Sequence, residues 1–157
     1  MTRAGIGYDL HRLAAGRKLM IGGIEVPFEK GSVGHSDGDV LLHALCDALL
    51  GAAGLGDIGT HFPDTGPQWK GVSSLIFLDQ TRKMLEGRKL KIQNIDAVVI
   101  CEKPKLGPHF PAMRAEIARS LGVPVEQINL KAKTNEGTGE IGRGEAIAAQ
   151  VIAMLEG

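Results

Sequence analysis

Two histidines and an aspartate are the residues of this sequence best suited to chemistry. Asp9 and His11 stand two positions apart, and His43 follows inside an apolar segment with helical periodicity. Residues two apart on a strand project from the same face, so Asp9 and His11 could reach one metal ion. Two imidazoles and a carboxylate suit a divalent metal, zinc best, and three protein ligands leave one coordination position open. The pattern indicates a catalytic metal site; a surface Asp-x-His with an unrelated helical histidine is the alternative.

The segment just before His43 combines a histidine with possible helix caps. Residues 35–39 are His-Ser-Asp-Gly-Asp. Free N–H groups at a helix N-terminus, together with His35, suit an oxyanion such as phosphate. Capping by the serine or the aspartates accounts for the acidic residues but not for His35. Asp47, one helical turn after His43, could orient its imidazole, although another contact could occupy that carboxylate.

Two further segments carry polar groups that a phosphorylated ligand could use. In the glycine- and proline-rich loop 55–72, Asp57–Gly59 and Phe62–Gly66 could bind hydroxyls or phosphate, or could serve turns alone. Lys133–Gly137 ends an alternating strand and enters a glycine-rich turn that reaches Arg143. A hydroxyl, a carboxylate and a guanidinium together are typical of a phosphate and metal clamp, whose carboxylate would prefer a hard cation such as Mg²⁺. A solvated strand end is the alternative.

The composition favours a single cytoplasmic domain. The 157 residues are 43% apolar, enough to bury a core. Lys plus Arg equals Asp plus Glu at 18 each, so no net field attracts nucleic acid or an anionic membrane. No stretch approaches the roughly 20 apolar residues of a membrane span, and the N-terminus lacks the apolar run of a signal peptide. Cys46 and Cys101 form no CxxC pair and are expected to be reduced core residues.

Hydrophobic periodicity predicts a mixture of strands and helices. A strand over 3–11 is interrupted by Gly5 and Gly7, and a hairpin over 19–28 turns at Gly22-Gly23. Helices are expected at 40–53 with Asp39 as the cap, at 73–86, at 110–121 and at 144–156, and further strands at 92–101 and 128–135. Strands and helices do not alternate regularly. The predicted class is therefore α+β, a single domain with a mixed β-sheet covered by helices on one face.

Seven short motifs follow one another along nearly the whole chain. They are Gly-Tyr-Asp-Leu-His at 7–11, His-Ser-Asp-Gly-Asp at 35–39, Leu-His-Ala-Leu at 42–45, Gly-Asp-Ile-Gly at 56–59, Phe-Pro-Asp-Thr at 62–65, Pro-Lys-Leu at 104–106 and Gly-Arg-Gly-Glu at 142–145. Each motif is weak alone. In this order they resemble the 2-C-methyl-D-erythritol 2,4-cyclodiphosphate synthase family of the non-mevalonate isoprenoid pathway. The resemblance implies one synthase domain over 1–157 and a homotrimer with active sites between subunits.

The resemblance also implies an activity and its metal ions. The enzyme would be a phosphorus–oxygen lyase acting on 4-diphosphocytidyl-2-C-methyl-D-erythritol 2-phosphate. The 2-phosphate would attack the β-phosphorus, expel CMP and close 2-C-methyl-D-erythritol 2,4-cyclodiphosphate. Asp9, His11 and His43 would hold zinc, whose open position takes a β-phosphate oxygen. Glu136 would hold a second ion, Mg²⁺ or Mn²⁺.

Site residues carry over from the family motifs to matching positions. His35 and Thr134 would stabilise the transition state. Substrate contacts would come from Asp9, His11, His35, Ser36, Asp57, Ile58, Gly59, Phe62, Pro63, Asp64, Thr65, Gly66, Lys133, Thr134, Asn135, Glu136, Glu140 and Arg143. The nucleotide pocket would comprise Cys101, Glu102, Lys103, Pro104, Lys105, Leu106 and Gly107.

Three residues depart from the family pattern. Glu140 stands where many relatives carry an apolar residue near the trimer axis, which argues against an apolar isoprenoid cavity there and favours pairing with Arg143. Lys133 replaces a small hydroxyl residue of some members, and Gly66 replaces a second acidic residue. Two other functions are weighed beside the synthase. One is a zinc-dependent phosphohydrolase in which water attacks, and the other is a non-catalytic trimeric module that binds nucleotide or isoprenoid.

Overall fold

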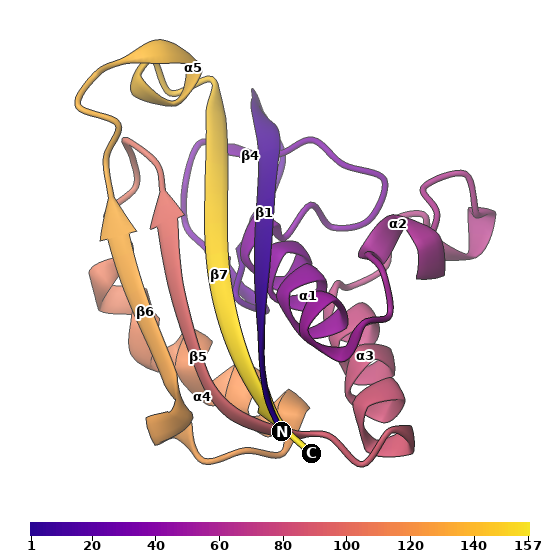
Figure 1. Ribbon diagram of the computed structural model, residues 1–157. Coiled ribbons are helices and arrows are strands. Elements are labelled where there is room, and N and C mark those ends of the chain that lie inside the picture. Colours follow the sequence, from indigo (N-terminus) through magenta and orange to yellow (C-terminus); the bar gives the residue numbers. More distant parts are fainter.

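A five-stranded mixed sheet forms one layer of the protein (Figure 1). The computed structural model describes residues 1–157. The strand order is β4-β1-β7-β5-β6, and only β5 and β6 run parallel. The strands are β1 Thr2–Ala15, β4 Lys30–Ser32, β5 Lys91–Ile100, β6 Ile128–Lys133 and β7 Ala146–Glu156, and a separate hairpin pairs β2 Leu19–Ile21 with β3 Ile24–Val26.

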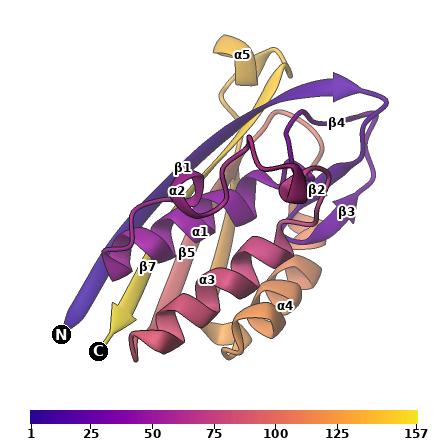
Figure 2. The ribbon, with the colours of Figure 1, turned by 90° about the vertical axis from the view of Figure 1, so that its right-hand side faces the viewer.

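Three long helices cover one face of this sheet (Figure 2). They are α1 Val40–Ala53, α3 Leu75–Gly87 and α4 Phe110–Leu121. Shorter turns are α2 Ile58–His61, α5 Gly139–Gly142, and the 3₁₀ turns η1 Pro67–Trp69, η2 Gly107–His109 and η3 Val125–Gln127. One continuous apolar core lies between the sheet and the helices. The predicted α+β domain, with a mixed sheet covered on one face, is confirmed.

The signals at helix and turn ends also proved reliable. The Asp39 carboxylate caps α1 by accepting a hydrogen bond from the Leu42 N–H, and Gly54 ends the helix in the left-handed region. The same carboxylate accepts bonds from the Gly22 and Gly23 N–H groups, at 2.9 and 2.8 Å. Asp39 therefore ties the start of α1 to the β2–β3 turn. Segment 55–72, predicted as a loop, contains the short helical turns α2 and η1.

The first strand is longer than predicted, because its glycines do not interrupt it. A Cβ atom on Gly5 would collide with the Ala48 carbonyl, and one on Gly7 would collide with the Ala44 carbonyl. Both colliding atoms belong to the backbone of α1. The glycines thus let α1 lie directly against β1, a close approach that no other residue allows.

The helix predicted over 144–156 is wrong, since this segment is the central strand β7. It pairs antiparallel with β1 on one side and with β5 on the other. Its alanines favour a helix in isolation, but the position of the segment between two strands and beneath α1 overrides that propensity.

None of the helices has the length and hydropathy that a membrane span requires. Cys46 and Cys101 are both buried free thiols, as expected.

Candidate active site

The β1 strand and the α1 helix bring Asp9, His11 and His43 together. Asp9 and His11 project from one face of β1 toward α1, which carries His43 in its first turns. The Asp9 Oδ2 atom lies 3.0 Å from His11 Nδ1 and 3.1 Å from His43 Nδ1. One ligand atom from each residue lies within 4.8 Å of the other two. This spacing is suitable for a shared divalent cation.

The surroundings of the three residues match a metal site. His11 Nδ1 is buried and has no hydrogen-bond partner, although it lies close to Asp9. A buried nitrogen without a partner is costly unless an ion completes its environment. Burial would raise the pKa of Asp9, but the His11 and His43 imidazoles outweigh it and lower that pKa. Burial would lower the pKa of His43, but Asp9 outweighs it and raises that pKa. The carboxylate is thus held in the anionic form that a cation requires.

The other nitrogen of His43 is also engaged. His43 Nε2 lies 2.8 Å from Ser74 Oγ and 3.1 Å from Ser36 Oγ. The hypothesis that Asp47 orients this imidazole is wrong, because the Asp47 carboxylate accepts the Ile58 N–H at 2.7 Å. Asp47 therefore anchors the start of α2. Ser74 was not singled out from the sequence, and nothing in its local pattern distinguishes it from a helix cap.

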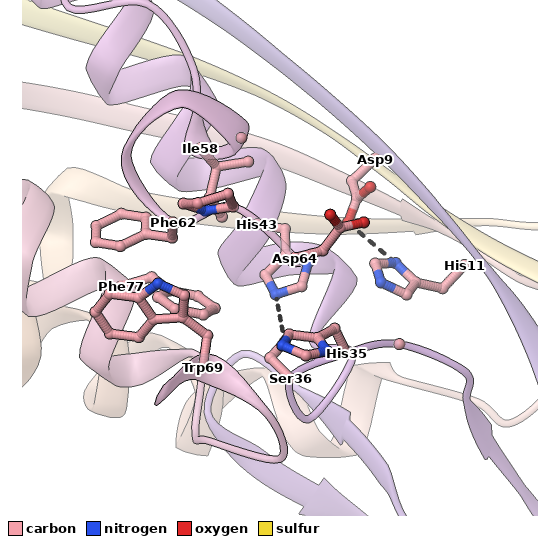
Figure 3. Close-up of a pocket in the computed structure, with 13 residues that line it drawn as sticks. Asp9, His11, His35, Ser36, His43, Ile58, Phe62, Asp64, Trp69 and Phe77 are labelled. Atoms are coloured by element: carbon pink, nitrogen blue, oxygen red, sulfur yellow. Dashed lines mark hydrogen bonds and ion pairs between the residues drawn. The ribbon is translucent and has the colours of Figure 1, made fainter. Parts of the chain in front are cut away.

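A cavity of about 440 Å³ opens beside the three residues (Figure 3). His35 lies at its edge, with Nε2 2.9 Å from the Gly66 carbonyl oxygen. The cavity is lined by Asp9, His11, Gly34, His35, Ser36, His43, Ile58, Gly59, Phe62, Pro63, Asp64, Trp69 and Phe77. Five of the eight residues predicted in the segments Asp57–Gly59 and Phe62–Gly66 therefore line the cavity together with the metal triad. Asp57 instead caps α2 by accepting the Thr60 N–H, and Thr65 is exposed outside the cavity.

Three aromatic rings form one wall of this cavity. Phe62 stacks on Phe77 with ring centroids 4.8 Å apart, and Trp69 meets both rings edge-on. Trp69 and Phe77 were not predicted as site residues. The lone tryptophan in a polar loop was the available signal, because a buried aromatic body with a polar tip is common in binding sites. Phe77 gave no such signal, since it follows the apolar pattern of α3.

Six of the seven predicted nucleotide residues line a second, separate groove, and Lys103 does not. A hollow of about 270 Å³ is lined by Cys101, Glu102, Pro104–Pro108 and Ala132–Thr134. Glu102 Oε1 accepts the N–H groups of Asn135 and Gly137, at 2.9 and 3.1 Å. Between them Glu136 has a φ of +52°, which non-glycine residues rarely adopt. Glu102 therefore holds the loop that presents Glu136.

The charged residues near the C-terminal strand lie in another hollow. It is lined in part by Glu102, Lys103 and Arg143. Arg143 pairs with Glu145 at 3.0 Å, whereas Glu140 lies farther away at 3.9 Å. The expected pairing of Glu140 with Arg143 is thus the weaker of the two. Lys133, Thr134, Asn135, Glu136, Glu140 and Arg143 do not line the cavity that contains the metal triad.

Comparisons with known proteins agree with this arrangement. The YgbB family model matches residues 2–156. The 2-C-methyl-D-erythritol 2,4-cyclodiphosphate synthase of Alkaliphilus metalliredigens is 58% identical over 153 residues, 98% of this chain and 96% of that protein. The enzyme of the same name from Gloeobacter violaceus is 53% identical over 154 residues, 98% of this chain and 94% of that protein.

Solved structures of similar proteins share the fold of this chain. A 2C-methyl-D-erythritol-2,4-cyclodiphosphate synthase in a CDP-bound form has a TM-score of 0.90 and 41% identity, covering 98% of this chain and 100% of that one. A CDP complex of Plasmodium falciparum IspF has a TM-score of 0.87 and 33% identity, covering 98% and 95%. The chain therefore belongs to the YgbB family, that of the 2-C-methyl-D-erythritol 2,4-cyclodiphosphate synthases.

Proposed function

We propose that residues 1–157 form one cyclodiphosphate synthase domain. The substrate is 4-diphosphocytidyl-2-C-methyl-D-erythritol 2-phosphate. An oxygen of its 2-phosphate bonds to the β-phosphorus, the bond from that phosphorus to the α–β bridging oxygen breaks, and CMP leaves with that oxygen. The reaction adds no water, so the enzyme is a phosphorus–oxygen lyase of isoprenoid precursor synthesis. The observation that carries this proposal is the Asp9–His11–His43 cluster opening on a cavity, in a chain of this family.

Asp9, His11 and His43 would hold the first divalent ion. Two imidazole nitrogens and one carboxylate oxygen favour zinc over the harder cations. When bound, the ion supplies Lewis-acid withdrawal of charge from a phosphate oxygen. His35 would donate a ring N–H to a reacting phosphate; in the structure its Nε2 atom lies 2.9 Å from the Gly66 carbonyl oxygen. The backbone of Ile58 and Gly59 and the Phe62–Asp64 segment would hold the methylerythritol portion.

A second copy of the chain would complete the site. Thr134 and the 101–107 groove lie outside the cavity that contains the triad, so one chain supplies two separate half-sites. Cys101–Gly107 would receive the cytidine, Thr134 would stabilise the transition state, and Glu136 would hold Mg²⁺ or Mn²⁺ beside the diphosphate. We propose a homotrimer that brings half-sites of neighbouring subunits together.

The open face of the sheet supplies the surface for that assembly. Ile6, Tyr8, Leu10 and Ile152 are between 48% and 63% exposed. Ile6 pairs with Ile152 across β1 and β7, so these side chains form a patch opposite the helices. Apolar residues gathered in one patch are typical of an interaction surface. Light scattering should report three chains per particle, and replacing Ile6 with Lys should release monomers.

Product analysis tests the reaction itself. Purified protein should release CMP from the cytidyl substrate, lose that activity after chelation and regain it with zinc. The cyclic product made in H₂¹⁸O should contain no ¹⁸O. Incorporated ¹⁸O would establish the phosphohydrolase instead. If folded, zinc-loaded protein releases no CMP, the non-catalytic binding module is the remaining function.

A further inference from the structure

A line of hydrogen bonds leads from His43 to a carboxylate outside the cavity. His43 Nε2 lies 2.8 Å from Ser74 Oγ, and that hydroxyl donates to Asp37 Oδ1. The Ser74 N–H donates to the other oxygen, Asp37 Oδ2, at 3.1 Å. Ser74 is fully buried. Neither Ser74 nor Asp37 lines the cavity, but Ser74 Oγ contacts two residues that do, His43 at 2.8 Å and Ser36 at 3.4 Å.

The direction of these bonds makes His43 Nε2 a donor to Ser74. A carboxylate only accepts hydrogen bonds, so the Ser74 hydroxyl proton is committed to Asp37. The Ser74 oxygen therefore faces His43 with a lone pair, and His43 Nε2 must be the donor. A neutral imidazole with its proton on Nε2 has a lone pair on Nδ1. In the structure His43 Nδ1 lies 3.1 Å from Asp9 Oδ2, which also only accepts, so Nδ1 donates to Asp9 as long as no ion is bound. An ion bound at Nδ1 would replace that proton and leave the one on Nε2.

The Ser74 hydroxyl does not cap the helix that begins after it, α3. Ser74 occupies the N-cap position, yet its side chain makes no capping hydrogen bond. The neighbouring Ser73 hydroxyl accepts the Leu75 N–H instead, at 3.3 Å. Serine at an N-cap normally satisfies a helix N–H. Here the hydroxyl oxygen instead accepts a hydrogen bond from the His43 imidazole.

We propose that Ser74 and Asp37 are the positioning residues of the metal centre. They hold His43 in the Nε2–H tautomer and fix the plane of its ring, so that Nδ1 presents its lone pair to the ion. This inference rests on the proposed metal site at Asp9, His11 and His43. Ser36 also lies within 3.1 Å of His43 Nε2, but no carboxylate accepts the proton of its hydroxyl. Ser36 Oγ also lies 3.4 Å from Ser74 Oγ, and it is the more distant of the two hydroxyls from His43 Nε2.

Metal affinity tests this proposal without reference to turnover. Zn²⁺ and Co²⁺ dissociation constants are measured by chelator competition on the full chain. Because outer partners of metal-bound histidines contribute about 10- to 100-fold in affinity, S74A should bind both ions that much more weakly. D37N, which keeps an acceptor for the hydroxyl but loses the charge, should weaken binding less. S73A is the matched control and should bind like the wild type.

A second measurement needs no variant. In ¹⁵N-histidine spectra of the zinc-loaded wild type, the remaining His43 proton should be on Nε2 and exchange slowly with solvent. A proton on Nδ1, or S74A affinity equal to that of S73A, overturns the proposal. If the wild type releases no CMP while S74A still loses affinity, the synthase assignment fails and the positioning role stands. If the wild type is active and S74A binds normally, the positioning role alone fails.

Discussion

Replacing Gly7 with alanine should separate the two elements that carry the metal ligands. The new Cβ atom would overlap the Ala44 carbonyl and also meet the Ala48 N–H. Both obstacles are backbone atoms of α1, so no side chain can rotate away to make room. The helix must therefore move off β1, or the strand must bend. Either movement displaces His43 from Asp9 and His11.

The size of the effect follows from the rigidity of those neighbours. Overpacking a core costs about 1–3 kcal/mol, and a collision with backbone belongs at the upper end of that range. For a chain of this length each kcal/mol lowers the melting temperature by about 2–4 °C, so we expect a loss of about 6–12 °C. A misplacement of about 1 Å can reduce catalysis about 100-fold. Metal affinity should fall as well, since His43 then reaches the ion poorly.

Calorimetry, chelator competition and CMP release together measure these effects. Gly51→Ala is the matched control, because Gly51 lies in α1 and a Cβ there would be 4.0 Å from the nearest atom, the Ile6 carbonyl oxygen. Alanine in a helix interior is favoured over glycine by about 0.5–1 kcal/mol, so this control should be slightly stabilised. A Gly7→Ala protein that melts with the wild type and binds zinc equally well would refute the close-approach argument.

Three further predictions concern other parts of the molecule. Asp39→Ala removes the acceptor of three backbone N–H groups and should cost about 3 kcal/mol of unfolding free energy, measured in urea. Glu102→Ala should speed amide exchange in loop 134–138 and raise KM, and Glu102→Gln, which keeps the accepting oxygen, should restore both. Burial raises the pKa of Cys46 to about 12 and of Cys101 to about 11, so at pH 8 both should resist a thiol reagent until urea unfolds the chain.

Features with local causes were predictable from the sequence. The α1 helix has its cap, its apolar stripe and its terminal glycine within one short segment. The Gly22-Gly23 turn likewise lies between two apolar runs, and its hairpin formed as predicted. The Asp9 and His11 pair needed only the two-residue period of a strand. His43 lies beside that pair because α1 packs directly against β1.

Features with distant causes could not be predicted in this way. The β7 segment is rich in alanine and becomes a strand only because β1 and β5 flank it. Ser74 lies 31 residues from His43, and its hydroxyl is aimed by Asp37 rather than by its own helix. Phe77 belongs to the apolar stripe of α3 and enters the cavity through tertiary packing. In each case the deciding partner is far away in the chain.

The prediction that Gly5 and Gly7 interrupt the first strand was wrong for a reason that explains the site. Gly5 pairs with Ala153 and Gly7 with Val151, and the next position on that face pairs Asp9 with Ala149. Gly5, Gly7, Ala149 and Ala153 thus present little or no side chain beneath α1, which lets the helix backbone lie against β1. Asp9 follows the two glycines on the same face of β1, so its carboxylate projects toward α1 where that helix already lies near the strand. The small residues of β1 and β7 therefore set the short distance from Asp9 to His43 that a shared metal ion requires.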